Sequence, residues 1–251
     1  MELNSTLLTR LLPALLVVLW NRPTAAQAID KNELTTEFYG MSVTGRVGGL
    51  VYGGMTQGFA ASDDDFNSYQ AAAVATFRLI PRPLYGWVGF LYRFTNSHSS
   101  TDQHEYRPFG VLFAGTDPTL AVRLSLLSRA EYLIKTASDG SALDDYWRLR
   151  SRVGFDFPIG KTAWEKGSFY GLADIEPLFE LRSETSSVDE LRIRFGLGYL
   201  ITERWIVEAI WTLSLHSTNS EPLAWDRNMF RFRAKYRWEE LGRLVAAGFD
   251  F

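Results

Sequence analysis

A histidine flanked by serines is the feature of this chain whose residue types come nearest to nucleophilic catalysis. His216 follows Ser214 by two residues and precedes Ser217. A serine becomes a nucleophile when a histidine nitrogen accepts its proton over about 2.6–3.2 Å. In an extended strand Ser217 points away from His216, and Ser214 shares its face at about 7 Å, too far for that transfer. Lipid hydrolysis by His216 with a nearby serine therefore remains an alternative, and we expect no enzyme activity.

Metal and cofactor chemistry find less support. The chain contains no cysteine, which excludes zinc sites built on thiolates, and His98 and His104 have no companion at ligand spacing. Asp63-Asp64-Asp65 offers oxygen ligands to a divalent cation such as Ca²⁺, but a solvated acidic loop explains the same residues. We expect no metal and no cofactor.

A set of charged side chains at alternate positions in the C-terminal half is more distinctive. The basic members are Arg148, Arg150, Arg152, Arg182, Arg192, Arg194, Arg231, Arg233, Lys235 and Arg237. The acidic members are Asp156, Asp174, Glu176, Glu180 and Glu208. Around one lumen, low-dielectric walls would focus a positive field that attracts anionic solutes. The same residues could instead form a salt-bridged plug that fills a narrow barrel, and the sequence leaves both interpretations open.

Strands with two unlike faces must position these charges. In Leu191–Tyr199 and Phe230–Trp238, apolar residues alternate with arginine, lysine or glycine. Successive side chains of a strand point to opposite faces, so each segment has an apolar face and a cationic face. An arginine facing lipid near the middle of a bilayer costs about 2–4 kcal/mol. We therefore predict that the apolar rows face lipid and the charged rows face the lumen.

The same alternation predicts strands along most of the chain. We expect them at 36–44, 46–58, 69–80, 84–96, 104–114, 120–136, 144–157, 169–182, 189–201, 204–217, 227–238 and 243–251. Short turns alternate with longer polar connections, which is typical of outer-membrane proteins, and bacterial barrels have an even number of strands. The expected fold class is all-β, an antiparallel transmembrane β-barrel of 10–12 strands. The role of residues 239–251, as a further strand or an extension, is left open.

The N-terminal segment predicts export. Arg10 precedes the apolar stretch Leu11–Trp20, which is shorter than the roughly 20 residues of a spanning helix. Ala26-Gln27-Ala28 is typical of a signal-peptidase site. We expect residues 1–28 to be a signal peptide cleaved after Ala28, with an uncleaved anchor helix as the alternative. Residues 29–251 would then form a single barrel domain in the cell outer membrane.

The C-terminal residues suggest how such a barrel would be assembled. The chain ends in Phe249-Asp250-Phe251, a terminal aromatic of the kind expected of a signal to the barrel-assembly machinery, and Tyr236-Arg237-Trp238 could serve instead. The other expected partners are outer-membrane lipid and lipopolysaccharide. We expect no nucleic-acid partner, and the oligomeric state is not fixed by the sequence.

A soluble barrel is the main structural rival. A lipocalin-like periplasmic protein would turn the apolar rows inward around an apolar ligand and expose the arginines to water. Alternation alone does not say which face is inside. The export signal, the terminal aromatic and the number of strands favour the membrane form.

Three segments resemble a family of bacterial outer-membrane β-barrels catalogued as domain of unknown function 2490. They are Tyr146–Gly154, Asp174–Phe179 and Leu191–Tyr199, within a resemblance that spans roughly 120–238, and the chain departs from the family by continuing past Trp238. The resemblance implies a fold and a location but no activity and no catalytic residues. The function expected is a structural role, or passive handling of a small anionic solute through the Arg-rich lumen, with a porin as the conducting case.

Overall fold

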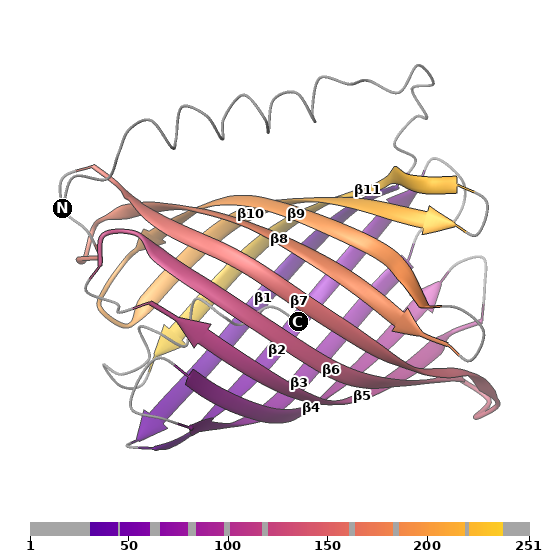
Figure 1. Ribbon diagram of the computed structural model, residues 1–251. Helices are drawn as coiled ribbons and strands as arrows, with labels where there is room; N and C mark the ends of the chain where they lie inside the picture. Colours follow the sequence, from indigo (N-terminus) through magenta and orange to yellow (C-terminus); the bar gives the residue numbers. More distant parts are fainter. Residues whose placement is uncertain are drawn as a thin grey trace.

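Eleven strands close into one barrel in the part of the chain that the computed structural model describes. Those residues are 31–44, 46–60, 66–79, 84–97, 101–116, 120–160, 164–182, 186–218 and 221–237. The strands are β1 Lys31–Thr44, β2 Val47–Ala60, β3 Phe66–Arg78, β4 Leu84–Ser97, β5 Gln103–Gly115, β6 Arg123–Ala137, β7 Ala142–Ile159, β8 Phe169–Leu181, β9 Ser186–Leu200, β10 Trp205–Thr218 and β11 Glu221–Arg237. Each strand pairs with the next, and β1 pairs with β11 (Figure 1). Closure leaves neither β1 nor β11 as a free edge.

The closing pair of strands corrects the prediction. Neighbours along the chain are antiparallel, but β1 and β11 run parallel, with Lys31 opposite Arg227 and Met41 opposite Arg237. An odd number of alternating strands forces this, because the first and the last then run the same way. Eleven lies within the predicted 10–12, whereas the even number and the purely antiparallel sheet are wrong for the described residues. The predicted strand 243–251 lies outside those residues, as do the predicted signal peptide and the terminal aromatic residue.

The barrel has two ends, which we name from β1. At the Lys31 end, where β1 begins, the turn Ser138–Ser141 joins β6 to β7, and Gly140 there has a φ of 85° that favours glycine. This turn is shorter than the polar loop predicted there, because β7 begins at Ala142. At the Thr44 end, where β1 stops, β7 and β8 are joined by the longer connection 160–168. Within the described ranges, no helix has the length and apolar character needed to cross a membrane.

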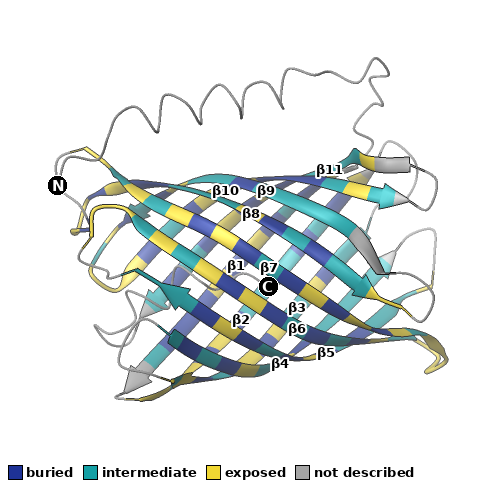
Figure 2. Ribbon diagram, viewed as in Figure 1, coloured by how far each residue is buried: buried dark blue, intermediate teal, exposed yellow. Residues whose placement is uncertain are grey.

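Burial alternates along the strands (Figure 2). In β7 the side chains of Trp147 and Val153 are 51% and 54% exposed, whereas those of Arg150 and Arg152 are buried. Large exposed apolar residues occur on all eleven strands. The apolar rows face outward and the charged rows inward, as predicted, and a lipocalin-like barrel requires the reverse.

The interior is not polar throughout, which the sequence did not reveal. Strands β1 to β6 contribute an apolar group that we call the aromatic cluster: Tyr39, Met41, Leu50, Tyr52, Ala72, Val74, Tyr85, Trp87, Leu91, Phe109, Val111, Phe113 and Leu127. The rings of Trp87 and Phe113 stack with their centres 5.2 Å apart. A Cβ at Gly89 would lie 2.4 Å from the ring of Phe109, so glycine makes room for that ring. The cluster fills part of the lumen.

Candidate functional site

Ion pairs occupy much of the remaining interior, and the first group is centred on Glu176. This carboxylate is 1% exposed and accepts hydrogen bonds from Arg150, with Nη2 at 2.9 and 3.0 Å from its two oxygens. It also accepts one from Nη2 of Arg194 at 3.0 Å, while Nε of Arg194 donates to Asp174 at 2.6 Å. Strands β7, β8 and β9 are thus joined by side chains as well as by backbone. Because removing one partner would leave an uncompensated buried charge, the group is stable only as a whole.

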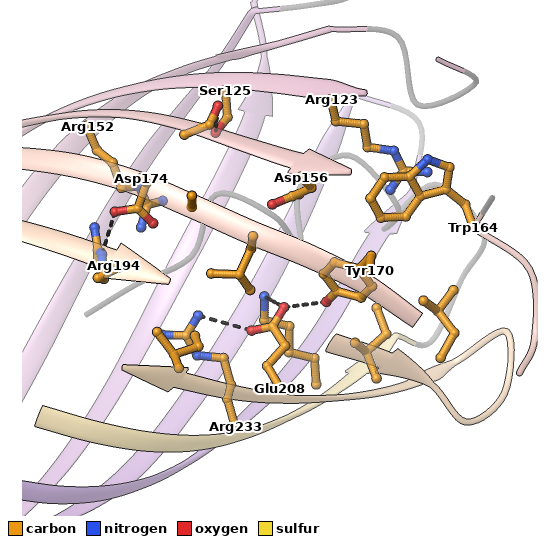
Figure 3. Close-up of a pocket in the computed structure, with 17 residues that line it drawn as sticks. Arg123, Ser125, Arg152, Asp156, Trp164, Tyr170, Asp174, Arg194, Glu208 and Arg233 are labelled. Atoms are coloured by element: carbon orange, nitrogen blue, oxygen red, sulfur yellow. Dashed lines mark hydrogen bonds and ion pairs between the residues drawn. The ribbon is translucent and has the colours of Figure 1, made fainter. Parts of the chain in front are cut away.

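A second group is centred on Glu208 and crosses the closing pair of strands; Figure 3 shows Glu208 with Tyr170 and Arg233. Glu208 accepts hydrogen bonds from Tyr170 Oη at 2.5 Å, Lys235 Nζ at 2.8 Å and Arg233 Nη1 at 3.3 Å. Nε of Arg233 also donates to Glu37 at 2.8 Å. Since Glu37 belongs to β1, this group ties the first strand to the last.

A third group lies mainly on β5 and β6, where the sequence predicted no lumen-facing charges. Glu131 is fully buried and pairs with Arg129 at 2.6 Å and with Arg148. On the neighbouring strand Glu105 pairs with Arg107. In both strands a carboxylate and an arginine stand two residues apart, so the alternation that found the C-terminal charges could have found these as well.

The predicted lumen residues lie mostly inside the barrel. The buried ones are Arg148, Arg150, Arg152, Arg194, Arg231, Arg233, Lys235, Glu176 and Glu208. Those of intermediate burial are Arg192, Asp156, Asp174 and Glu180. Arg182 differs: it follows the end of β8, its side chain is 48% exposed, and it pairs with Asp144 at the rim. The side chain of Arg237 lies outside what the structure describes.

Two cavities lie in the interior, and the ion pairs separate them. The Lys31-end cavity has a volume of about 110 Å³ and the Thr44-end cavity about 50 Å³, with no lining residue in common. Arg150 lines the first and Arg194 the second, and Glu176 bonds to both. Glu37 of the first cavity bonds in the same way to Arg233 of the second. We call these five residues the septum.

Trp164, from the connection between β7 and β8, lines the Thr44-end cavity and lies beside Arg123 (Figure 3). Its indole Nε1 donates to the carbonyl oxygens of Leu120 and Ala121, each at 3.2 Å. The guanidinium carbon of Arg123 lies 3.4 Å from the centre of the Trp164 ring, a cation–π contact. Trp164 has a φ of 62°, which is uncommon outside glycine. Several contacts therefore fix this side chain in the wall of the cavity.

The Lys31-end cavity is strongly cationic. Seven arginines and two glutamates line it, an excess of five positive charges: Arg93, Arg107, Arg148, Arg150, Arg192, Arg227, Arg231, Glu33 and Glu37. Hydroxyl and amide side chains complete the lining, among them Thr35, Ser68 and Gln70. Low-dielectric surroundings strengthen the field of such a cluster. The cavity is suited to an anion.

The nucleophile and metal candidates are not assembled into sites in the described residues. The hydroxyl of Ser214 bonds to Glu190, and His216 is exposed, with no side-chain hydrogen bond within the described residues. His104 bonds to the hydroxyl of Tyr92 at 2.7 Å. The described ranges contain no group of three or more metal-ligating side chains. Asp63-Asp64-Asp65 and His98 lie outside them.

Comparison with protein families supports the similarity found in the sequence. The model of a family described as a protein of unknown function, DUF2490, matches residues 43–222. The match runs from the end of β1 into β11, so it begins well before the range of roughly 120–238 expected from the sequence and includes most of the N-terminal half. No curated protein matches the chain.

Proposed function

The chain belongs to the DUF2490 family, described as a protein of unknown function, and from that premise we propose a function based on geometry. The protein is a β-barrel of the cell outer membrane with a structural role. It holds small anions in its cationic interior and forms no open pore. Outer-membrane lipid and lipopolysaccharide are its surroundings.

The observation that carries this proposal is the division between the two faces of the barrel wall. Exposed apolar side chains occur on all eleven strands. Soluble proteins rarely expose contiguous apolar patches larger than a few hundred Å². Turning the barrel inside out would place arginines such as Arg150 in contact with lipid, at about 2–4 kcal/mol each near mid-bilayer.

Aromatic residues near the strand ends support the same placement. At the Thr44 end the rings of Trp205 and Tyr236 lie 4.8 Å apart, and those of Phe169 and Tyr199 lie 4.6 Å apart. All four residues stand within two positions of a strand terminus. Aromatic girdles of this kind mark the interfaces of transmembrane barrels.

The filled interior favours a closed barrel over a porin. The aromatic cluster occupies the lumen beside β1 to β6, the septum separates the two cavities, and Trp164 lines the Thr44-end cavity. A passage for solutes would require the septum ion pairs to break. The cationic Lys31-end cavity is then a recess that anions can enter from one side.

Two experiments test the proposal. In fractionated cells we expect the protein in the outer membrane, migrating anomalously on gels until the sample is boiled, as closed barrels do. A soluble periplasmic band unaffected by boiling would refute membrane insertion. In planar bilayers the purified barrel should give no steady conductance, and stable anion-selective channels would show that the interior is open.

A further inference from the structure

The charge of the Lys31-end cavity is only partly neutralised by the surrounding pairs. Three glutamates at its edge are each shared between two basic residues. Glu131 serves Arg129 and Arg148, and Glu176 serves Arg150 and Arg194. Glu37 bonds to Arg233 and lies 3.8 Å from Arg231. Arg107, Arg192 and Arg227 each pair with a glutamate as well, namely Glu105, Glu190 and Glu33. The positive charge that remains therefore comes from the sharing of the first three glutamates and from Arg93, the lining arginine for which the described residues contain no ion pair.

Arg93 is the clearest source of this excess positive charge. It stands on β4 and lines the cavity, and its Nε is buried without a hydrogen-bond partner among the described residues. No ion pair of the described ranges involves it. Arg93 as a whole is of intermediate burial, and a partly buried cation without an ion-pair partner is unfavourable. Arg93 is therefore the group in this cavity that gains most from a bound anion.

The other lining groups complete the requirements of an anion site. A guanidinium has five N–H donors, and an ion pair such as that of Arg148 with Glu131 leaves others to donate. Thr35 and Thr56 contribute hydroxyls that lie 3.0 Å apart, and Thr95 and Ser68 contribute two more at 3.4 Å. These groups come from β1, β2, β3 and β4, while the arginines come mostly from strands beyond β4. An anion would therefore be surrounded by donors.

The size and charge of the cavity define the class of ligand. A volume of about 110 Å³ corresponds to a few water molecules at about 30 Å³ each, which suits a compact anion without an apolar part. The planar fork of arginine binds two oxygens of one anion at once. The excess charge favours an ion with more than one negative charge over chloride.

We propose that the Lys31-end cavity is a binding site for a phosphate-type oxyanion, with Arg93 as a direct ligand. This inference rests on the proposed function and specifies it, because it names the anion class and the residues that hold it. The septum closes the site on the side of the Thr44 end, so the anion enters and leaves by the Lys31 end. The shared chemistry is the doubly charged tetrahedral oxyanion, either free or as the terminal group of a larger solute.

The test is titration of the purified, folded barrel with inorganic phosphate by calorimetry, with chloride at matched ionic strength as the reference. We expect saturable phosphate binding and a higher melting temperature in phosphate than in chloride. Arg93→Gln should weaken phosphate binding at least tenfold. Arg182→Gln removes the same charge at the rim of the same end, outside the cavity lining, and should change the affinity less than twofold.

Folding of the variant can be checked separately. Because Nε of Arg93 is buried without a hydrogen-bond partner among the described residues, Arg93→Gln should melt without phosphate at a temperature no lower than the parent. A phosphate monoester serves as the second ligand. Binding of both ligands would identify the site with phosphate groups in general, and binding of inorganic phosphate alone would identify it with the free ion.

Three results would overturn the inference: no saturable binding by the folded parent, equal affinity in Arg93→Gln, or equal losses in Arg93→Gln and Arg182→Gln. The last would reduce the effect to general attraction by positive charge. Failure here is distinct from failure of the proposed function, because the titration needs only folded protein and the location is decided by fractionation.

Discussion

Leu91 and Glu176 are both fully buried inside the same barrel, and different forces hold them. Leu91 belongs to the aromatic cluster of β1 to β6. Its burial is favourable by itself, because apolar surface leaves water. Glu176 belongs to the ion pairs of the septum, where the attraction to Arg150 and Arg194 must first offset the cost of removing three charges from water.

The difference between these regions suggests that they contribute different properties to the interior. The aromatic cluster supplies stability, since close-packed apolar groups gain from every contact. The septum supplies a specific arrangement of charge, since a buried ion pair is often no more stable than an apolar replacement of similar shape. Breaking one pair and replacing the whole group should therefore have opposite consequences.

The largest loss of stability is expected when one charged side chain is removed and its ion-pair partners remain buried. Glu176→Ala leaves Arg150 and Arg194 buried without their shared carboxylate, which should lower the free energy of unfolding by about 3–5 kcal/mol. Urea unfolding of the barrel in detergent measures this. Glu180→Gln on the same strand, where the side chain is 25% exposed, should cost about 0–1 kcal/mol. Equal losses in the two variants would contradict the account.

A loss of about 2–5 kcal/mol is expected from Leu91→Ala, which leaves a void in the aromatic cluster. The matched control is Leu112→Ala on the outer face, where the side chain is 55% exposed and lipid or detergent can fill the space. The same urea titration compares them. A control that loses as much as Leu91→Ala would mean that the cluster is not the main source of stability.

The smallest loss of stability is expected when the whole ion-paired trio is replaced by apolar residues. Replacing Arg150, Glu176 and Arg194 together by Met, Leu and Met removes both septum pairs of Glu176 and leaves no unpaired partner within that trio. Unfolding should then require as much urea as in the parent, or more. Asp174 loses its hydrogen bond from Arg194, but 13% of its side chain is exposed. A loss as large as that of Glu176→Ala would show that the septum itself stabilises the fold.

The sequence predicted the two faces of the C-terminal strands because apolar residues and arginines alternate there without interruption. It missed the aromatic cluster because inward residues such as Tyr52 and Trp87 stand in strands whose outward residues are also apolar. It also missed the parallel closure of β1 on β11, which depends on the total count of strands. Which glutamate meets which arginine follows from the register between strands, and alternation along one strand does not contain that information.

The most direct test of the account asks which face of the wall meets lipid. The chain has no cysteine, so one introduced cysteine carries one nitroxide label. Leu124, Ser125 and Leu126 are consecutive in β6; the leucines are 54% and 51% exposed, and Ser125 lines the Thr44-end cavity. In lipid bilayers, labels at Leu124→Cys and Leu126→Cys should be relaxed by oxygen dissolved in the bilayer, and a label at Ser125→Cys should be protected. A lipid-exposed label at 125, or water-exposed labels at 124 and 126, would contradict the account.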